Sequence, residues 1–165
     1  MGITKFEQSL ADGEHSKLMA LQGSWKGITK TWFEKDVLVD EAPMQATITA
    51  ILGNRFISCD YSGSLEGKPF EGKMIIGYDI PYQQYTFTWM DSFHMGTQIM
   101  QAKGDATANG FSIMGSYGNP EWGDQLFGWR TELKIVSGNE FVLTAYNVMP
   151  GEEEAKATET VYKRA

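Results

Sequence analysis

The chain has 165 residues, of which 42% are hydrophobic and 21% are charged, and these values are typical of one soluble domain with its own core. Its net charge of −7 argues against nucleic-acid and anionic-membrane partners, because both require a dense positive surface. The single cysteine, Cys59, excludes an internal disulfide framework and is expected to be an inert, half-buried thiol on a strand.

The first 21 residues have a different pattern from the rest of the chain. Leu18, Met19 and Leu21 follow Ser16 at helical spacing, which predicts a short helix at about residues 14–21 after a loose arm. A helix this short needs support, so we expect it to cover one mouth of the main fold. The N-terminus has no apolar secretion signal, and no run approaches the about 18 apolar residues of a membrane span. The sequence therefore predicts a cytoplasmic protein that does not bind membranes.

From Gly23 onward, apolar and polar residues alternate along one strand-like run after another. The clearest runs cover residues 42–50, 70–78, 85–89, 111–117 and 127–135. Short turns rich in Gly, Asn, Asp and Pro separate them, as at Asn109-Gly110. Consecutive strands joined by short turns form a meander, and closing it removes its exposed edges. We predict an all-β fold, an up-and-down antiparallel barrel of about ten strands with one short N-terminal helix.

The alternation continues to the C-terminus without a linker or a repeat, which predicts a single β-barrel domain over residues 1–165. In this division residues 1–21 form the N-terminal arm and short helix, and residues 22–165 form the barrel. The longest interruption is residues 118–124, which is too long for a minimal hairpin. A loop of this kind at a barrel mouth either carries function or is a plain surface loop.

A Gly-x-Trp sequence, Gly23-Ser24-Trp25, stands between the expected helix and the first strand. In this position it resembles the motif that opens lipocalin and other calycin barrels. Together with Ile76-Gly77-Tyr78-Asp79, the strand 85–91, Trp129-Arg130-Thr131 and the ending Tyr162-Lys163-Arg164, the whole chain resembles the DUF1579 family of uncharacterised bacterial proteins. The resemblance implies a calycin-like barrel in which Trp25 is structural and Arg164 or Lys163 covers its indole. It implies no activity.

The apolar faces of several strands are candidates for the wall of a lumen that holds a small apolar or amphipathic molecule. His94 and Arg130 are the polar groups expected to orient the head of this molecule. The predicted ligand-binding residues are Met74, Tyr78, Phe87, Trp89, His94, Trp129 and Arg130.

Two alternatives to this binding role remain open from the sequence. One is an enzyme that uses the same cavity, with His94 as a general base oriented by Asp91 and with Arg130 beside the substrate. The other is a structural barrel whose core is filled by its own side chains. Alternation alone leaves open whether Arg130 and Glu132 face the lumen or form an exposed ladder of ion pairs.

The sequence predicts neither a metal nor a cofactor. Two distant histidines, His15 and His94, and one cysteine do not form a transition-metal site. The nitrobindin branch of the calycins holds haem, which makes His94 a candidate axial ligand. In that branch the ligand comes late in the chain, and this sequence has no histidine after His94.

Overall fold

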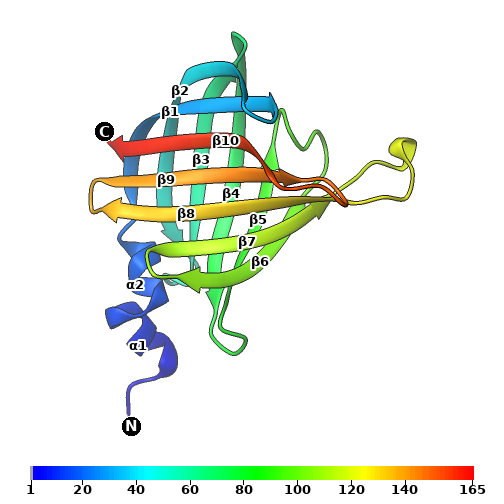
Figure 1. The fold of residues 1–165 in the computed structure, drawn as a ribbon. Helices are drawn as coiled ribbons and strands as arrows, with labels where there is room; N and C mark the ends of the chain where they lie inside the picture. Colours follow the sequence, from blue (N-terminus) through cyan, green and yellow to red (C-terminus); the bar gives the residue numbers. More distant parts are fainter. Residues whose placement is uncertain (1) are drawn as a thin grey trace.

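A computed structural model describes residues 2–165, most of which form one closed antiparallel barrel (Figure 1). Each strand pairs with its neighbours in the chain, and the first strand pairs with the last, so the sheet has no free edge. This confirms the predicted all-β up-and-down barrel of ten strands. The strands are β1 (Gly23–Glu34), β2 (Val37–Ile51), β3 (Phe56–Leu65), β4 (Lys68–Asp79), β5 (Gln84–Asp91), β6 (Met100–Thr107), β7 (Gly110–Tyr117), β8 (Phe127–Ser137), β9 (Glu140–Val148) and β10 (Ala155–Arg164).

The N-terminal segment is helical over most of its length. The expected helix is present as α2 (Glu14–Met19), and the arm before it, which was expected to be loose, contains α1 (Lys5–Asp12). The arm is ordered because Thr4 and Glu7 form a capping box, in which each side chain accepts from the backbone N–H of the other residue. Both helices lie below one end of the barrel, where β1 begins (Figure 1).

The end of the barrel nearest the helices is closed by Trp25. Its side chain is buried against Phe141, and its Nε1–H donates to the carbonyl oxygen of Leu21 at 2.8 Å. The guanidinium of Arg164 lies 4.3 Å from the centre of the indole ring. It also donates to three carbonyl oxygens, those of Ala20, Gln22 and Gly138. Arg164 thus joins the end of α2, the start of β1 and the β8–β9 turn across the closed end.

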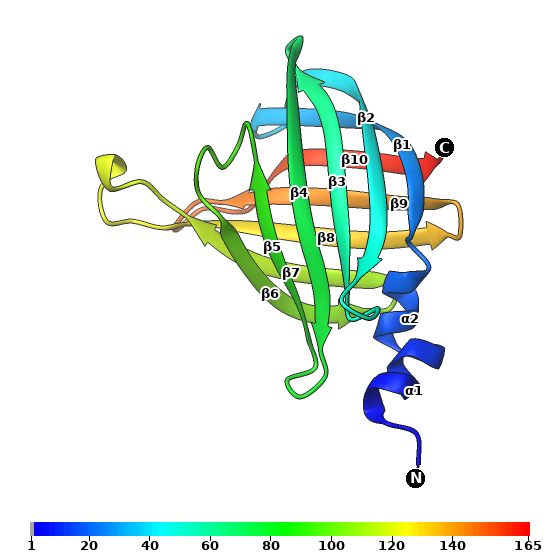
Figure 2. The ribbon, with the colours of Figure 1, turned by 180° about the vertical axis from the view of Figure 1, so that it is seen from behind.

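The opposite end carries the longer connections. The β5–β6 loop (92–99) and the β7–β8 loop (118–126), which contains the 3₁₀ turn η1 (Pro120–Trp122), project from this end, away from the helices (Figure 2). Within residues 2–165, no helix has the length and apolar character needed to span a membrane. The barrel therefore has one plugged end and one end bordered by long loops, and the candidate site lies near the latter.

Candidate functional site

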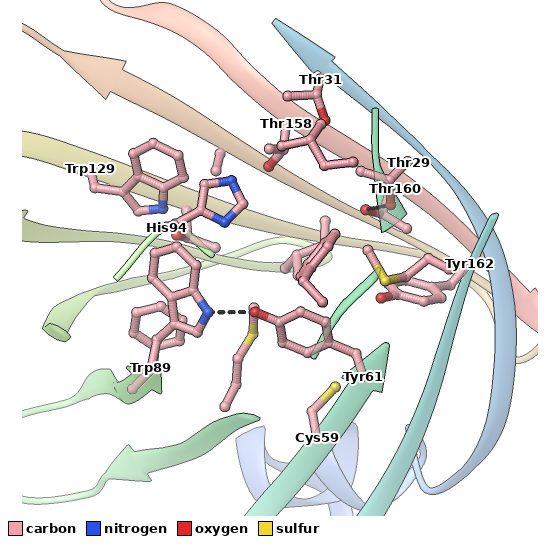
Figure 3. A pocket seen from close by; sticks show the side chains of 18 of the residues that line it. Thr29, Thr31, Cys59, Tyr61, Trp89, His94, Trp129, Thr158, Thr160 and Tyr162 are labelled. Carbon is pink, nitrogen blue, oxygen red and sulfur yellow. Dashed lines mark hydrogen bonds between the residues drawn. The ribbon is translucent and has the colours of Figure 1, made fainter. Parts of the chain in front are cut away.

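A cavity of about 70 Å³ lies inside the barrel, between the plugged end and the long loops (Figure 3). Eight of the ten strands, all but β6 and β7, and the β5–β6 loop contribute residues to its lining. This volume holds several water molecules, since one requires about 10–15 Å³. It is smaller than the about 300–1,000 Å³ of pockets that enclose drug-sized ligands. In this conformation the lumen is therefore suited to a small molecule.

One wall of the cavity is aromatic. Phe87 and Trp89 of β5 and Trp129 of β8 all point inward. The two indoles stack with an interplanar angle of 19° and a centroid distance of 5.7 Å. The sequence predicted all three residues as ligand contacts, and the structure places them, with Met74, around one cavity. Such a wall offers flat faces to a planar ring.

The facing wall carries hydroxyl groups. Thr29 and Thr31 of β1 and Thr158 and Thr160 of β10 line it at alternate positions of the closing strand pair (Figure 3). Thr29 and Thr160 hydrogen-bond to each other at 2.7 Å. Thr31 is 5% exposed, and its side chain lines the cavity beside this pair. The lumen is therefore amphipathic, with flat apolar rings facing a row of hydroxyls.

The Asp91–His94 pair borders the aromatic wall. The Asp91 side chain is fully buried, and its Oδ1 accepts the backbone N–H groups of Phe93 and Met95 at 3.2 and 2.8 Å. Its Oδ2 lies 2.6 Å from Nδ1 of His94. The His94 ring lies 5.6 Å from that of Trp89 and 6.0 Å from that of Trp129, measured between centroids. Because the carboxylate accepts a hydrogen bond from Nδ1–H, the other ring nitrogen, Nε2, is left free as an acceptor.

Tyr61 of β3 reaches the same wall from the other side. Its hydroxyl oxygen accepts the Nε1–H of Trp89 at 2.6 Å, and its side chain lines the cavity (Figure 3). Burial raises the pKa of Tyr61 above its ordinary value of 10, which the hydrogen bond from Trp89 opposes only in part. The phenol is therefore neutral at physiological pH and keeps its own proton available as a donor.

Two of the predicted ligand residues lie away from the cavity. Tyr78 is near the helices, where its ring packs against Tyr85 and His15 at centroid distances of 5.0 and 6.1 Å. Arg130 lies on the outer face of β8, because Trp129 and Thr131 on either side of it point inward. The Tyr78 side chain is on the inward face of β4, as predicted, but it lies near the helix end of the strand and does not line the cavity.

The partners of Arg130 explain its outward position. Its guanidinium pairs in bidentate fashion with Glu154 at 2.8 Å and with Glu132 at 2.9 Å, and it lies 4.1 Å from the ring centre of Tyr146. Hydrogen bonding to Arg130 lowers the pKa of Glu154. The expected head-group clamp is therefore wrong for Arg130, and the alternative of an outer ladder of ion pairs describes it correctly.

The lumen does not match the requirements of a haem or of a metal. Among residues 2–165 no three His, Cys, Asp or Glu side chains converge to hold a metal ion. A haem is larger than most drug-sized ligands, and the cavity of about 70 Å³ does not accommodate it. Cys59 lines the cavity and is 6% exposed, so it is more buried than expected. Burial raises the pKa of its thiol to about 12, which leaves it protonated and a poor nucleophile.

Tyr61 and the hydroxyl wall were missed by sequence reasoning. The available signal was the pair of Thr-x-Thr segments, Thr29-Lys30-Thr31 and Thr158-Glu159-Thr160, which alternate with charged residues. Only barrel closure brings them together, since β1 and β10 stand at opposite ends of the chain. Tyr61 had a weaker signal, because its strand alternates less regularly than its neighbours.

Comparison with known proteins is consistent with this fold. The sequence model of the family described as protein of unknown function (DUF1579) matches residues 11–164. The solved structure of Rv2717c from M. tuberculosis is similar over 99% of both chains, with 14% identity and a TM-score of 0.58. The S-type phycobiliprotein lyase CPES from Guillardia theta is similar over 91% of both chains, with 10% identity and a TM-score of 0.54. Comparison with curated protein sequences gives no match.

Proposed function

The chain belongs to the DUF1579 family of calycin-like barrels, and from its lumen we propose that it binds a small, uncharged, ring-bearing molecule. The family description assigns no activity, and solved structures at 10–14% identity show the fold alone. The proposal therefore depends on the side chains of this chain.

The observation that carries it is a row of hydroxyl-bearing side chains on the wall of a largely apolar cavity. Thr31, Thr131 and Tyr162 are 5%, 3% and 3% exposed and line the cavity together with Thr29, Thr158 and Thr160. Most buried polar groups in folded proteins are paired, because a lost hydrogen bond costs about 1–3 kcal/mol. Polar atoms of a bound molecule, or water in its absence, would hydrogen-bond to the hydroxyls that line the cavity. A core built only for stability would place apolar residues here.

The walls indicate the chemistry of the ligand. Stacked indoles favour a planar ring, and the hydroxyls favour one or two polar substituents on its other face. Among residues 2–165, His94 is the one His, Lys, Arg, Asp or Glu side chain that lines the cavity, and its Nδ1 is already paired with Asp91. A fully ionised ligand would lose its hydration without gaining a counter-ion.

An entrance beside His94 supports the proposal. His94 lines the cavity and also a surface groove between the β5–β6 and β7–β8 loops. Phe93 and Trp122 border the groove and are 44% and 60% exposed. Exposed aromatic residues at the opening of an apolar lumen suit the passage of an apolar ring.

Isothermal titration calorimetry with two matched compounds tests the proposal. We expect 2-naphthol, a neutral two-ring compound, to bind one-to-one in the micromolar range, or about −8 kcal/mol. Naphthalene-2-sulfonate has the same rings and a fixed negative charge, and we expect it to bind at least about ten-fold more weakly because its charge is not compensated.

Two neighbouring residues on opposite faces of β8 provide the control. Trp129→Leu removes part of the aromatic wall and should weaken 2-naphthol binding about ten-fold, whereas Arg130→Gln changes only the outer face and should leave it unchanged. Absence of heat with every neutral ring compound tested would show that the lumen is a filled core. An equal loss of 2-naphthol affinity in the two variants would mean that the compound binds outside the barrel lumen.

A further inference from the structure

We propose that the lumen is also a proton-transfer site, in which His94 and Tyr61 catalyse the enolisation of a small ketone. The inference rests on the proposed function, because the ketone must first enter the same cavity. In the enzyme predicted from the sequence, Arg130 stood beside the substrate. Here Tyr61 takes that place, because its side chain lines the cavity whereas Arg130 is on the outer face of the sheet.

The β5–β6 loop positions the general base of the site, His94. The backbone N–H groups of Phe93 and Met95 and the Nδ1 of His94 all point at the Asp91 carboxylate. With three donors around it, this buried carboxylate has a fixed orientation. It thereby selects the His94 tautomer with the proton on Nδ1 and leaves Nε2 as the acceptor. The imidazolium that forms on proton uptake is stabilised by the same carboxylate.

The hydroxyl of Tyr61 is the hydrogen-bond donor of the site. It accepts the Nε1–H of Trp89 at 2.6 Å and donates to no residue among residues 2–165, so its own proton is free for an oxygen in the cavity. Donation by Trp89 polarises the phenol and strengthens it as a donor. His94 and Tyr61 approach the same indole, since the rings of His94 and Trp89 lie 5.6 Å apart and Tyr61 binds the indole nitrogen. A ligand on the face of Trp89 therefore has a base and a hydrogen-bond donor within reach (Figure 3).

The reaction needs only these groups. Nε2 of His94 takes a proton from the carbon next to the carbonyl, and the electron pair of the broken C–H bond forms a carbon–carbon double bond. The carbonyl π electrons move to the oxygen, which is stabilised as an enolate by the hydrogen bond from Tyr61. Return of the proton from Nε2 to the same carbon regenerates the ketone. Its return to the γ-carbon of a β,γ-unsaturated ketone gives the conjugated isomer.

The substrate class follows from the size and character of the cavity. A cavity of about 70 Å³ limits the ligand to one or two rings, and apolar walls favour a neutral carbonyl compound over a phosphorylated or carboxylated one. In this low-dielectric site the hydrogen bond from Tyr61 acts more strongly on a developing enolate than it would in water. Small cyclic ketones with an acidic α-carbon are therefore the class we assign.

The test uses cyclohex-3-enone and cyclohexanone as probes. Isomerisation of cyclohex-3-enone to cyclohex-2-enone is followed by the absorbance of the conjugated product, and loss of the α-hydrogens of cyclohexanone in D₂O by NMR. We expect the protein to accelerate both reactions at least about 100-fold over buffer containing an equal concentration of imidazole.

Three variants separate catalysis from structure. His94→Gln should abolish the acceleration, and Tyr61→Phe should reduce it about 10- to 100-fold. Asp91→Asn keeps the Oδ1 that caps the loop but presents an N–H to Nδ1, which forces the proton onto Nε2. It should therefore abolish the acceleration while probe binding, measured by calorimetry, persists. Arg130→Gln on the outer face is the matched control and should keep the full rate.

The outcomes distinguish this inference from the proposed function. If both ketones bind and neither reaction exceeds the rate of His94→Gln, the proton-transfer site is refuted and the binding role stands. If neither ketone nor 2-naphthol binds, both proposals fail together. If Asp91→Asn or Tyr61→Phe keeps the full rate, the assigned positioning residue or donor is wrong.

Discussion

His15 and His94 occupy opposite environments in the barrel. His94 lies in the loop at the open end with an anionic partner, while His15 is 3% exposed in α2 near the closed end. Nδ1 of His15 hydrogen-bonds to the hydroxyl of Ser9, and its ring packs edge-on against Phe6 at 5.0 Å. Burial lowers the pKa of His15 below its ordinary value of 6.5, and the nearby charge of Arg55 adds to this effect.

This shift has a definite sign for stability. The folded state resists protonation of His15, whereas the unfolded chain takes up the proton near the ordinary pKa of 6.5. Stability from this residue is therefore complete above that value and declines as pH falls below it. We expect urea midpoints to fall more between pH 7.5 and 5.0 in the parent than in His15→Gln. Parallel changes in the two proteins would mean that His15 titrates equally in both states.

At the scale of the strand, one glycine determines where the Tyr61 ring lies. Gly72 of β4 pairs with Tyr61 of β3 on one side and with Asp91 of β5 on the other. A Cβ at this position would lie 2.2 Å from Cζ and Oη of Tyr61. The absence of a side chain at Gly72 is therefore what allows the phenol to reach Trp89.

Gly72→Ala should displace the Tyr61 ring and break its hydrogen bond with Trp89. Leaving the buried indole N–H unpaired should cost about 1–3 kcal/mol, measured by urea unfolding. It should also lower the isomerisation rate as much as Tyr61→Phe does. Gly138→Ala, at a turn where no atom lies within 4 Å of the added carbon, is the control and should be nearly neutral. If both alanine variants unfold alike, the Tyr61 ring has room to move.

The elements of this barrel follow from alternation, while the functional site depends on pairings that alternation does not reveal. Residues 127–135 alternate clearly enough to predict β8, yet the same pattern fits an inward or an outward Arg130. Its direction follows from Glu154, a residue in the distant β9–β10 connection. The Asp91–His94 pair was predictable because its members are three residues apart. The Tyr61–Trp89 bond was not, because it joins two strands that are not neighbours in the sheet.

For the molecule as a whole, the central question is whether the barrel binds a ligand in its lumen or is filled by its own side chains. The closed end is built for stability, with Trp25 and Phe141 packed under Arg164. The middle of the barrel instead keeps a cavity and buried hydroxyls, both of which weaken a core. Proteins retain such features where function requires them, so filling the cavity should raise stability and remove binding.

Ala145→Val tests this directly. Ala145 lies on β9 between Thr131 and Thr158, and its methyl group faces the cavity. Two added carbons should raise the unfolding free energy by about 0.5–2 kcal/mol and weaken 2-naphthol binding at least about ten-fold. The same substitution at the exposed Ala106 of β6 is the control and should leave binding unchanged. A filled core would give the opposite result, because Ala145→Val would then overpack the barrel and destabilise it by about 1–3 kcal/mol.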